Sequence, residues 1–85
     1  MTSFDYSGKI VAITGASSGI GHEIAKAFYE CGAKLALCSR SAQRVKDAIA
    51  DFAQPDDPRV LVLSADSSQP ADLYAFRDAA VKQFG

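Results

Sequence analysis

The hydrophobic pattern of the chain alternates between short apolar runs and segments whose apolar residues recur at helical spacing. The apolar runs cover residues 9–14, 33–38 and 60–63. Runs of this length, rich in leucine and β-branched residues, are typical of strands buried on both faces. The segments with helical spacing cover residues 20–31, 45–52 and 73–84. The pattern therefore predicts the order β-α-β-α-β-α.

Each predicted helix presents an apolar face to the strands. In the first helix this face is expected to consist of Ile20, Ile24, Ala27, Phe28 and Cys31. Gly32 follows where a left-handed helix cap belongs, and Pro55 and Pro58 mark a loop before the third strand. The third helix is expected to begin near residues 68–70, where a proline fits the first turn.

Alternation of fully apolar strands with amphipathic helices requires parallel strands, right-handed crossovers and helices that cover the sheet. We therefore predict an α/β fold, the first half of a doubly wound parallel sheet with strand order 3-2-1. No internal repeat or linker divides the sequence, so residues 1–85 are expected to form part of one domain.

Composition narrows the classes of protein to which the chain can belong. It is 48% hydrophobic and 22% charged, as in ordinary globular proteins. Nine Lys and Arg are balanced by ten Asp and Glu, which argues against nucleic-acid binding. No apolar run approaches the roughly 20 residues of a membrane span, and residues 1–9 lack the apolar core of a secretory signal. A cytoplasmic protein is expected.

Two cysteines and one histidine offer no recognisable metal site. Cys31 and Cys38 lie within apolar patterns and are expected to be free, packed thiols. His22 is expected to be a solvated residue of the first helix, with no carboxylate or nucleophile near it.

The most informative segment is the glycine-rich turn at residues 14–21, between the first strand and the first helix. Gly15 lets the chain turn off the strand, Gly19 lets the backbone approach a pyrophosphate, and Gly21 lets the helix pack closely on the sheet. Unpaired N–H groups of the first helical turn can donate to phosphate oxygens, together with the hydroxyls of Ser17 and Ser18.

Other interpretations of these glycines fit less well. A P-loop needs Lys and then Ser or Thr after its last glycine, whereas His22 and Glu23 follow Gly21. A methyltransferase-like turn usually has an acidic residue before the glycines, where this chain has Thr14. A strand-to-helix turn that is merely tight remains an alternative.

The spacing G-x-x-x-G-x-G, with Ile20 before the last glycine and the run Gly8–Gly15 before it, resembles the short-chain dehydrogenase/reductase family. The likeness runs from Gly8 to Gly85. It implies an NAD(P)-binding Rossmann domain and, in the whole protein, hydride transfer between a nicotinamide and a small carbonyl or alcohol substrate. It also implies that Asp66, with Ser67 beside it, accepts a hydrogen bond from the adenine amino group. The alternative role for Asp66 is to cap the third helix.

The family's catalytic Tyr-x-x-x-Lys pair has no counterpart in this sequence. Four positions after Tyr6, Tyr29 and Tyr74 stand Ile10, Ala33 and Asp78, and there is no Asn. We expect the tyrosines to be packing or surface residues, the chain to end before a fourth strand, and the 85 residues to lack activity on their own. A stand-alone nucleotide-binding or interaction module, or a fragment without function, remains an alternative.

Cofactor choice depends on the residues after the second strand. NAD-preferring sites place an acid there, whereas this chain has Ser39, Arg40 and Ser41, with no acid between Glu30 and Asp47. A guanidinium binds the extra phosphate of NADP, and a serine hydroxyl can add a donor. NADP is therefore predicted over NAD, unless Arg40 is merely solvated.

The half-sheet should also leave its first strand with an unpaired edge. Exposed backbone groups beside apolar side chains favour self-association. We expect dimers, aggregates or a poorly cooperative fold.

Overall fold

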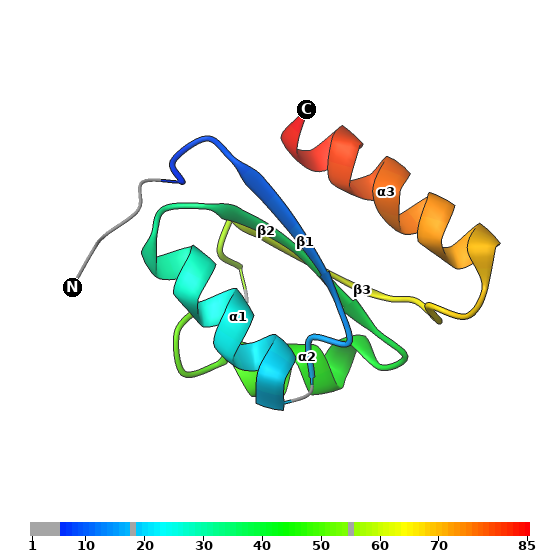
Figure 1. Ribbon diagram of the computed structural model, residues 1–85, viewed down its shortest axis with the longest axis horizontal. Coiled ribbons are helices and arrows are strands. Elements are labelled where there is room, and N and C mark those ends of the chain that lie inside the picture. Colours follow the sequence, from blue (N-terminus) through cyan, green and yellow to red (C-terminus); the bar gives the residue numbers. More distant parts are fainter. Residues whose placement is uncertain (1–5, 18, 55) are drawn as a thin grey trace.

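The computed structural model describes residues 6–17, 19–54 and 56–85. Its elements follow the predicted order and alternate strand with helix along the whole length (Figure 1). They are β1 Ile10–Thr14, α1 Gly19–Glu30, β2 Lys34–Ser39, α2 Ala42–Ile49, β3 Val60–Ser64 and α3 Pro70–Phe84.

The strands form one parallel sheet in the order β1-β2-β3, which confirms the predicted partial Rossmann arrangement. β2 is the central strand: Leu35 is in register with Val11 on one side and with Val60 on the other. Right-handed helical crossovers are the usual way to connect neighbouring parallel strands, and each connection here contains one helix. Because the strands are parallel, their carboxyl ends all lie at the same end of the sheet.

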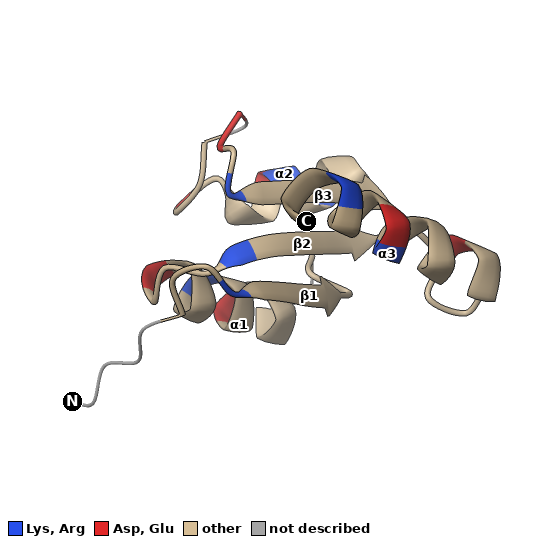
Figure 2. Ribbon diagram, turned by 90° about the horizontal axis from the view of Figure 1, so that it is seen from above, with Lys and Arg blue, Asp and Glu red and all other residues tan. Residues whose placement is uncertain are grey.

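Side chains that alternate along β2 divide the core into two layers. Leu35 and Leu37 are fully buried between the sheet and the pair α1 and α2. Ala36 and Cys38 face the opposite side, where they contact α3 through Phe76. Figure 2 shows the charged residues mostly on helices and loops, around a nearly uncharged sheet. The central strand is thus buried on both faces, as its apolar run predicted.

α1 turns a different face to the sheet from the predicted one. Its buried residues are Gly21 and Ala25, whereas Ile20 is 78% exposed and Ile24 is 42% exposed. Ile20 and Ile24 lie on one face of the helix, and Gly21 and Ala25, each one position later, lie on the neighbouring face. The small side chains of the second pair let the helix approach the sheet closely. The prediction that Ile20, Ile24 and Ala27 pack on the strands is therefore wrong, although Phe28 does contact the core.

In the described structure β1 is an edge strand that pairs only with β2, and its first residue, Ile10, is 42% exposed. Self-association through this edge stays a prediction, which sedimentation velocity can check.

Both cysteines are free, with Cys38 buried and Cys31 half-buried. Among the described residues, no helix is long and apolar enough to cross a membrane, and no group of three His, Cys, Asp or Glu could hold a metal ion.

Candidate functional site

A cleft of about 540 Å³ lies where the carboxyl ends of the strands meet the turns that follow them. Small polar residues and two arginines dominate its lining, which consists of Thr14, Gly15, Ser17, Ser39, Arg40, Ser41, Arg44, Ala65 and Ser67. In open parallel sheets, ligands bind in the crevice outside the carboxyl ends of the strands. The position and the basic side chains together favour an anionic ligand.

The glycine turn has the backbone geometry that close approach to a ligand requires. Gly15 adopts a left-handed conformation, with φ of +65°, so the chain reverses directly after β1. The turn is fixed to the sheet because the amide of Ala16 donates to the carbonyl of Cys38 at 3.2 Å. The position of a Cβ on Gly19 meets no atom within 4 Å, so this backbone is open to a ligand. Gly21 is buried against the sheet.

The other predicted residues of this turn differ in their relation to the cleft. Ser17 is exposed and lines it. Ser18 lies outside the described residues. Ile20 is exposed on the first turn of α1 and does not line the cleft. The first turn of α1 contains no acidic side chain of its own that would oppose an anion at this helix end.

The turn after β2 holds Arg40 between two serines with different roles. The hydroxyl of Ser39 donates to the carbonyl of Ser41 at 2.8 Å and accepts from its amide at 3.1 Å. Ser41 is the N-cap of α2, and its hydroxyl oxygen accepts from the amide of Arg44 at 3.3 Å. The proton of Ser39 is thus used within the turn, whereas the O–H of Ser41 can still donate to a ligand. The side chain of Arg40 is 84% exposed.

Asp66 stabilises the loop before α3. Its Oδ1 accepts from the amide and the hydroxyl of Ser68, at 2.9 and 2.7 Å, and lies 3.9 Å from Nε of Arg40. These hydrogen bonds from Ser68 hold the pKa of the Asp66 carboxyl below its usual value. Asp66 does not line the cleft, although Ser67 does. It is not the helix cap of the alternative interpretation, because Gln69 occupies the N-cap position of α3.

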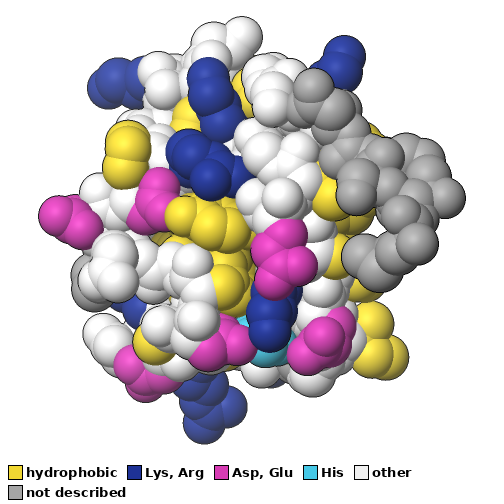
Figure 3. All heavy atoms as spheres, turned by 90° about the vertical axis from the view of Figure 1, so that its left-hand side faces the viewer, with side chains coloured by type: hydrophobic (Ala, Val, Ile, Leu, Met, Phe, Trp, Pro, Cys, Tyr) yellow, Lys and Arg dark blue, Asp and Glu magenta, His cyan; other side chains and the backbone are white. Residues whose placement is uncertain are grey.

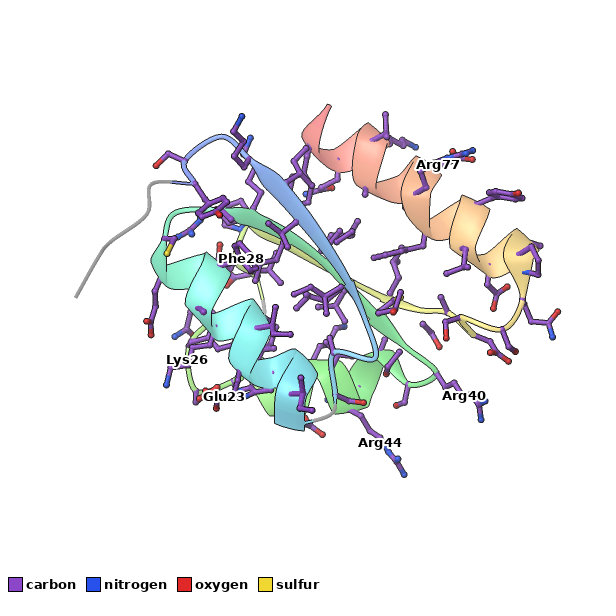
Figure 4. The ribbon with its side chains drawn as sticks, in the orientation of Figure 1. Glu23, Lys26, Phe28, Arg40, Arg44 and Arg77 are labelled. Carbon is purple, nitrogen blue, oxygen red and sulfur yellow. The ribbon has the colours of Figure 1, made fainter. Side chains whose placement is uncertain are left out.

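Arg44 lines the cleft but was not among the predicted residues. The sequence signal was present, since Arg44 follows Arg40 by four positions, but the sequence analysis considered only the residues directly after the second strand for the cofactor. In the structure α2 begins at Ala42, which places Arg44 in its first turn. Figure 4 shows the side chains of Arg40 and Arg44 extending from the same end of the molecule.

His22 is not the solvated residue that was predicted. Its side chain is 19% exposed, with Nε2 at 2.9 Å from Oδ1 of Asp51 and Nδ1 at 3.4 Å from Oε1 of Glu23. The ring packs on Phe52 with 5.8 Å between the ring centroids. Figure 3 shows the chain's single histidine (cyan) largely covered between acidic and basic side chains. The hydrogen bond to Asp51 raises the pKa of His22, and none of these residues lines the cleft.

Tyr29 lies away from the cleft and is confirmed as a packing residue. Its ring contacts Phe52 with 5.2 Å between centroids, and its hydroxyl donates to Asp57. Arg59 covers the ring, with its guanidinium carbon 4.0 Å from the centroid, and donates to the carbonyls of Tyr29 and Ala33 at 2.7 and 2.9 Å. Tyr74 is exposed on α3, as expected of a surface residue.

Comparison with known proteins identifies a family to which the chain is similar. Residues 9–85 match the family model described as short chain dehydrogenase. The chain is 41% identical over 84 residues to 11-beta-hydroxysteroid dehydrogenase A of Sesamum indicum, covering 95% of this chain and 23% of that protein. The chain thus spans about a quarter of the length of the curated relatives it matches.

Solved structures share the fold. The 3-ketoacyl-(acyl-carrier-protein) reductase of Brucella melitensis, in complex with NADH, superposes with a TM-score of 0.82 at 33% identity and covers 95% of this chain and 32% of that one. The N-domain of a bacterial malonyl-CoA reductase, with NADP, gives a TM-score of 0.81 at 26% identity, over 94% of this chain and 15% of that one.

Proposed function

Because the chain belongs to the short-chain dehydrogenase family, we propose that it is the cofactor-binding N-terminal part of a single NAD(P)-binding Rossmann domain in an oxidoreductase. The observation that carries the proposal is the cleft at the carboxyl ends of the strands, where the glycine turn and Arg40 lie together. The structural neighbours that hold NADH and NADP support a nicotinamide dinucleotide as the ligand.

The residues present fit such a group. Gly15 and Gly19 leave the backbone of the turn open for a pyrophosphate, and Ser17 can add a hydroxyl donor. Ser67 lines the same cleft after β3, beside Asp66, which supports placing the adenine there. The remaining residues assigned to the cofactor are Ser18, Ile20, Gly21, Ser39, Arg40 and Ser41.

NADP is the preferred cofactor in this proposal. The guanidinium of Arg40 is exposed just after β2. It can form charge-assisted hydrogen bonds to the additional phosphate of NADP, and these are stronger than hydrogen bonds between neutral groups. Asp66, which lies 3.9 Å from it, comes after β3 and not after β2, where an acid would favour NAD.

The parent reaction is proposed to be hydride transfer between the nicotinamide and a carbonyl or alcohol. The bound cofactor supplies the hydride chemistry, and this chain supplies binding and orientation. Neither Tyr29 nor Tyr74 lines the cleft, and the hydroxyl of Tyr29 is bonded to Asp57. We therefore expect the 85-residue chain to catalyse no dehydrogenase reaction on its own, which an assay of cofactor turnover checks.

Calorimetric titration of NADP and NAD against the full-length parent protein and its Arg40→Ala variant tests the cofactor proposal. NADP should bind more tightly to the wild type, and the substitution should weaken NADP binding roughly tenfold to a hundredfold while leaving NAD unchanged. A wild-type preference for NAD, or equal losses for the two cofactors, would contradict the proposal.

A further inference from the structure

We infer that Arg44 is a second specificity-determining residue, which binds the 2′-phosphate of NADP together with Arg40. The inference rests on the proposed preference for NADP and extends it to a residue outside the turn after β2. Arg44 lines the same cleft as Arg40, from the first turn of α2.

The partners of the four arginines separate Arg44 from the rest. Arg59 donates to the carbonyls of Tyr29 and Ala33, and Arg77 pairs with the adjacent Asp78 at 2.9 Å. Arg40 lies 3.9 Å from Asp66. Within the described part of the chain, Arg44 alone among the arginines has no ion pair, ring contact or side-chain hydrogen bond.

The one acid within reach on the same helix is occupied by another residue. Asp47 is three positions after Arg44, a spacing at which ion pairs form on a helix. Its Oδ1 instead accepts a hydrogen bond from Nε2 of Gln43 at 2.9 Å. Asp47 forms no ion pair with Arg44 in the described structure, so the guanidinium of Arg44 keeps its donors available for a ligand in the cleft.

Ser41 fixes the position of Arg44 relative to Arg40. As N-cap of α2, Ser41 accepts from the amide of Arg44 at 3.3 Å, and Ser39 holds the backbone of Ser41 from the other side. The two guanidinium groups thus start from one short, hydrogen-bonded turn and extend from the same end of the molecule (Figure 4). Ser41 lies between Arg40 and Arg44 in the sequence and lines the same cleft, so its hydroxyl can donate to the same anion.

A phosphate monoester matches this arrangement in charge and in number of acceptors. It carries close to two negative charges at neutral pH and presents three terminal oxygens, whereas each guanidinium offers a planar fork of donors. If Arg44 binds the 2′-phosphate, its removal should weaken only ligands that carry this phosphate. If the ligand is held only through its pyrophosphate at the glycine turn, removal of Arg44 should not change the affinity.

The test uses adenosine 2′,5′-bisphosphate, which carries the 2′-phosphate without the nicotinamide half, and adenosine 5′-monophosphate, which lacks the 2′-phosphate. Calorimetry on the 85-residue chain compares the wild type with Arg44→Ala, Arg44→Lys and Arg40→Ala. Lys46→Ala is the matched control, because Lys46 is an exposed cation of α2 outside the cleft.

Arg44→Ala should weaken the bisphosphate about tenfold and leave the monophosphate unchanged, since only one charge-assisted contact is lost. Arg44→Lys should lose less, because it keeps the charge without the fork. Lys46→Ala should match the wild type.

Three outcomes overturn the inference in distinguishable ways. If Arg40→Ala loses affinity for the bisphosphate but Arg44→Ala does not, the inference fails while the proposed function stands. If the wild type binds the bisphosphate no more tightly than the monophosphate, or binds neither, the NADP preference fails and the inference fails with it. Equal losses for both nucleotides in Arg44→Ala would assign Arg44 to a different phosphate.

Discussion

The two ends of the sheet use arginine in opposite ways. At the amino end, Arg59 lies over the ring of Tyr29 and donates to two backbone carbonyls, so its donors are used within the protein. At the carboxyl end, Arg40 and Arg44 line a cleft. The same residue type therefore stabilises the fold where its donors are satisfied and is available to a ligand where they are not. Burial and hydrogen-bond partners, not residue type, distinguish the two roles.

The largest expected effect is on stability at the amino end. Arg59→Ala leaves the carbonyls of Tyr29 and Ala33 without this donor and uncovers the ring, which should lower the free energy of unfolding by about 2 kcal/mol. Urea unfolding followed by circular dichroism measures the change. Arg77→Ala is the control, since its exposed pair with Asp78 should contribute less than about 0.5 kcal/mol. Equal effects of the two substitutions would remove the contrast between a structural and a surface arginine.

A smaller effect separates the first two glycines of the turn, Gly15 and Gly19. Gly15→Ala places a side chain at φ of +65° and should cost about 1 kcal/mol of stability. Gly19→Ala meets no atom within 4 Å and should leave stability unchanged, while its methyl group weakens nucleotide binding. Unfolding curves and calorimetry on both variants test this. Loss of stability in Gly19→Ala, with binding intact, would show that its role is structural.

The smallest expected effect depends on pH and concerns the link between α1 and the segment after α2. The pKa of His22 is raised above 6.5, chiefly by its hydrogen bond to Asp51, whose own pKa is lowered below 3.8. A raised pKa means that the stabilisation is complete below pH 6.5 and is lost as the pH rises through the folded-state value. It is also lost in acid, as the pH falls through the lowered pKa of Asp51.

Substitution of His22 by Gln should therefore reduce stability at pH 5.5 more than at pH 8.5, as measured by the urea midpoint at each pH. Lys26 and Glu23 also face this pair, so Glu23→Gln, which removes the weaker contact, serves as a comparison. If the urea midpoints of the wild type and His22→Gln differ by the same amount at both pH values, the stabilisation does not depend on protonation of His22 and the prediction is contradicted.

The elements and their order follow from local patterns, which is why the sequence predicts them. Apolar runs marked the strands, and the glycine spacing placed a turn with an open backbone before α1. Arg40 could be selected because it follows β2 directly, where parallel sheets bind ligands.

What the sequence did not predict depends on contacts between distant segments or on competing stripes of one helix. His22 and Asp51 are 29 positions apart, and Arg59 reaches Tyr29 across 30 positions, so no local pattern brings them together. In α1 the periodicity fits both the stripe of Ile20 and that of Gly21, and only packing against the sheet selects between them. Arg44 was missed because it lies in the first turn of α2, beyond the residues directly after β2 that the sequence analysis considered.

The most direct test of the account is to map where NADP binds by two-dimensional nitrogen–proton NMR of the 85-residue chain. The amides of Gly15, Gly19 and Ser41, at the carboxyl end of the sheet, should shift on titration. The amides of Ala33 and Arg59, at the amino end, should stay in place. Shifts confined to the amino end, or no shifts at millimolar NADP, would contradict the claim that this cleft binds the cofactor.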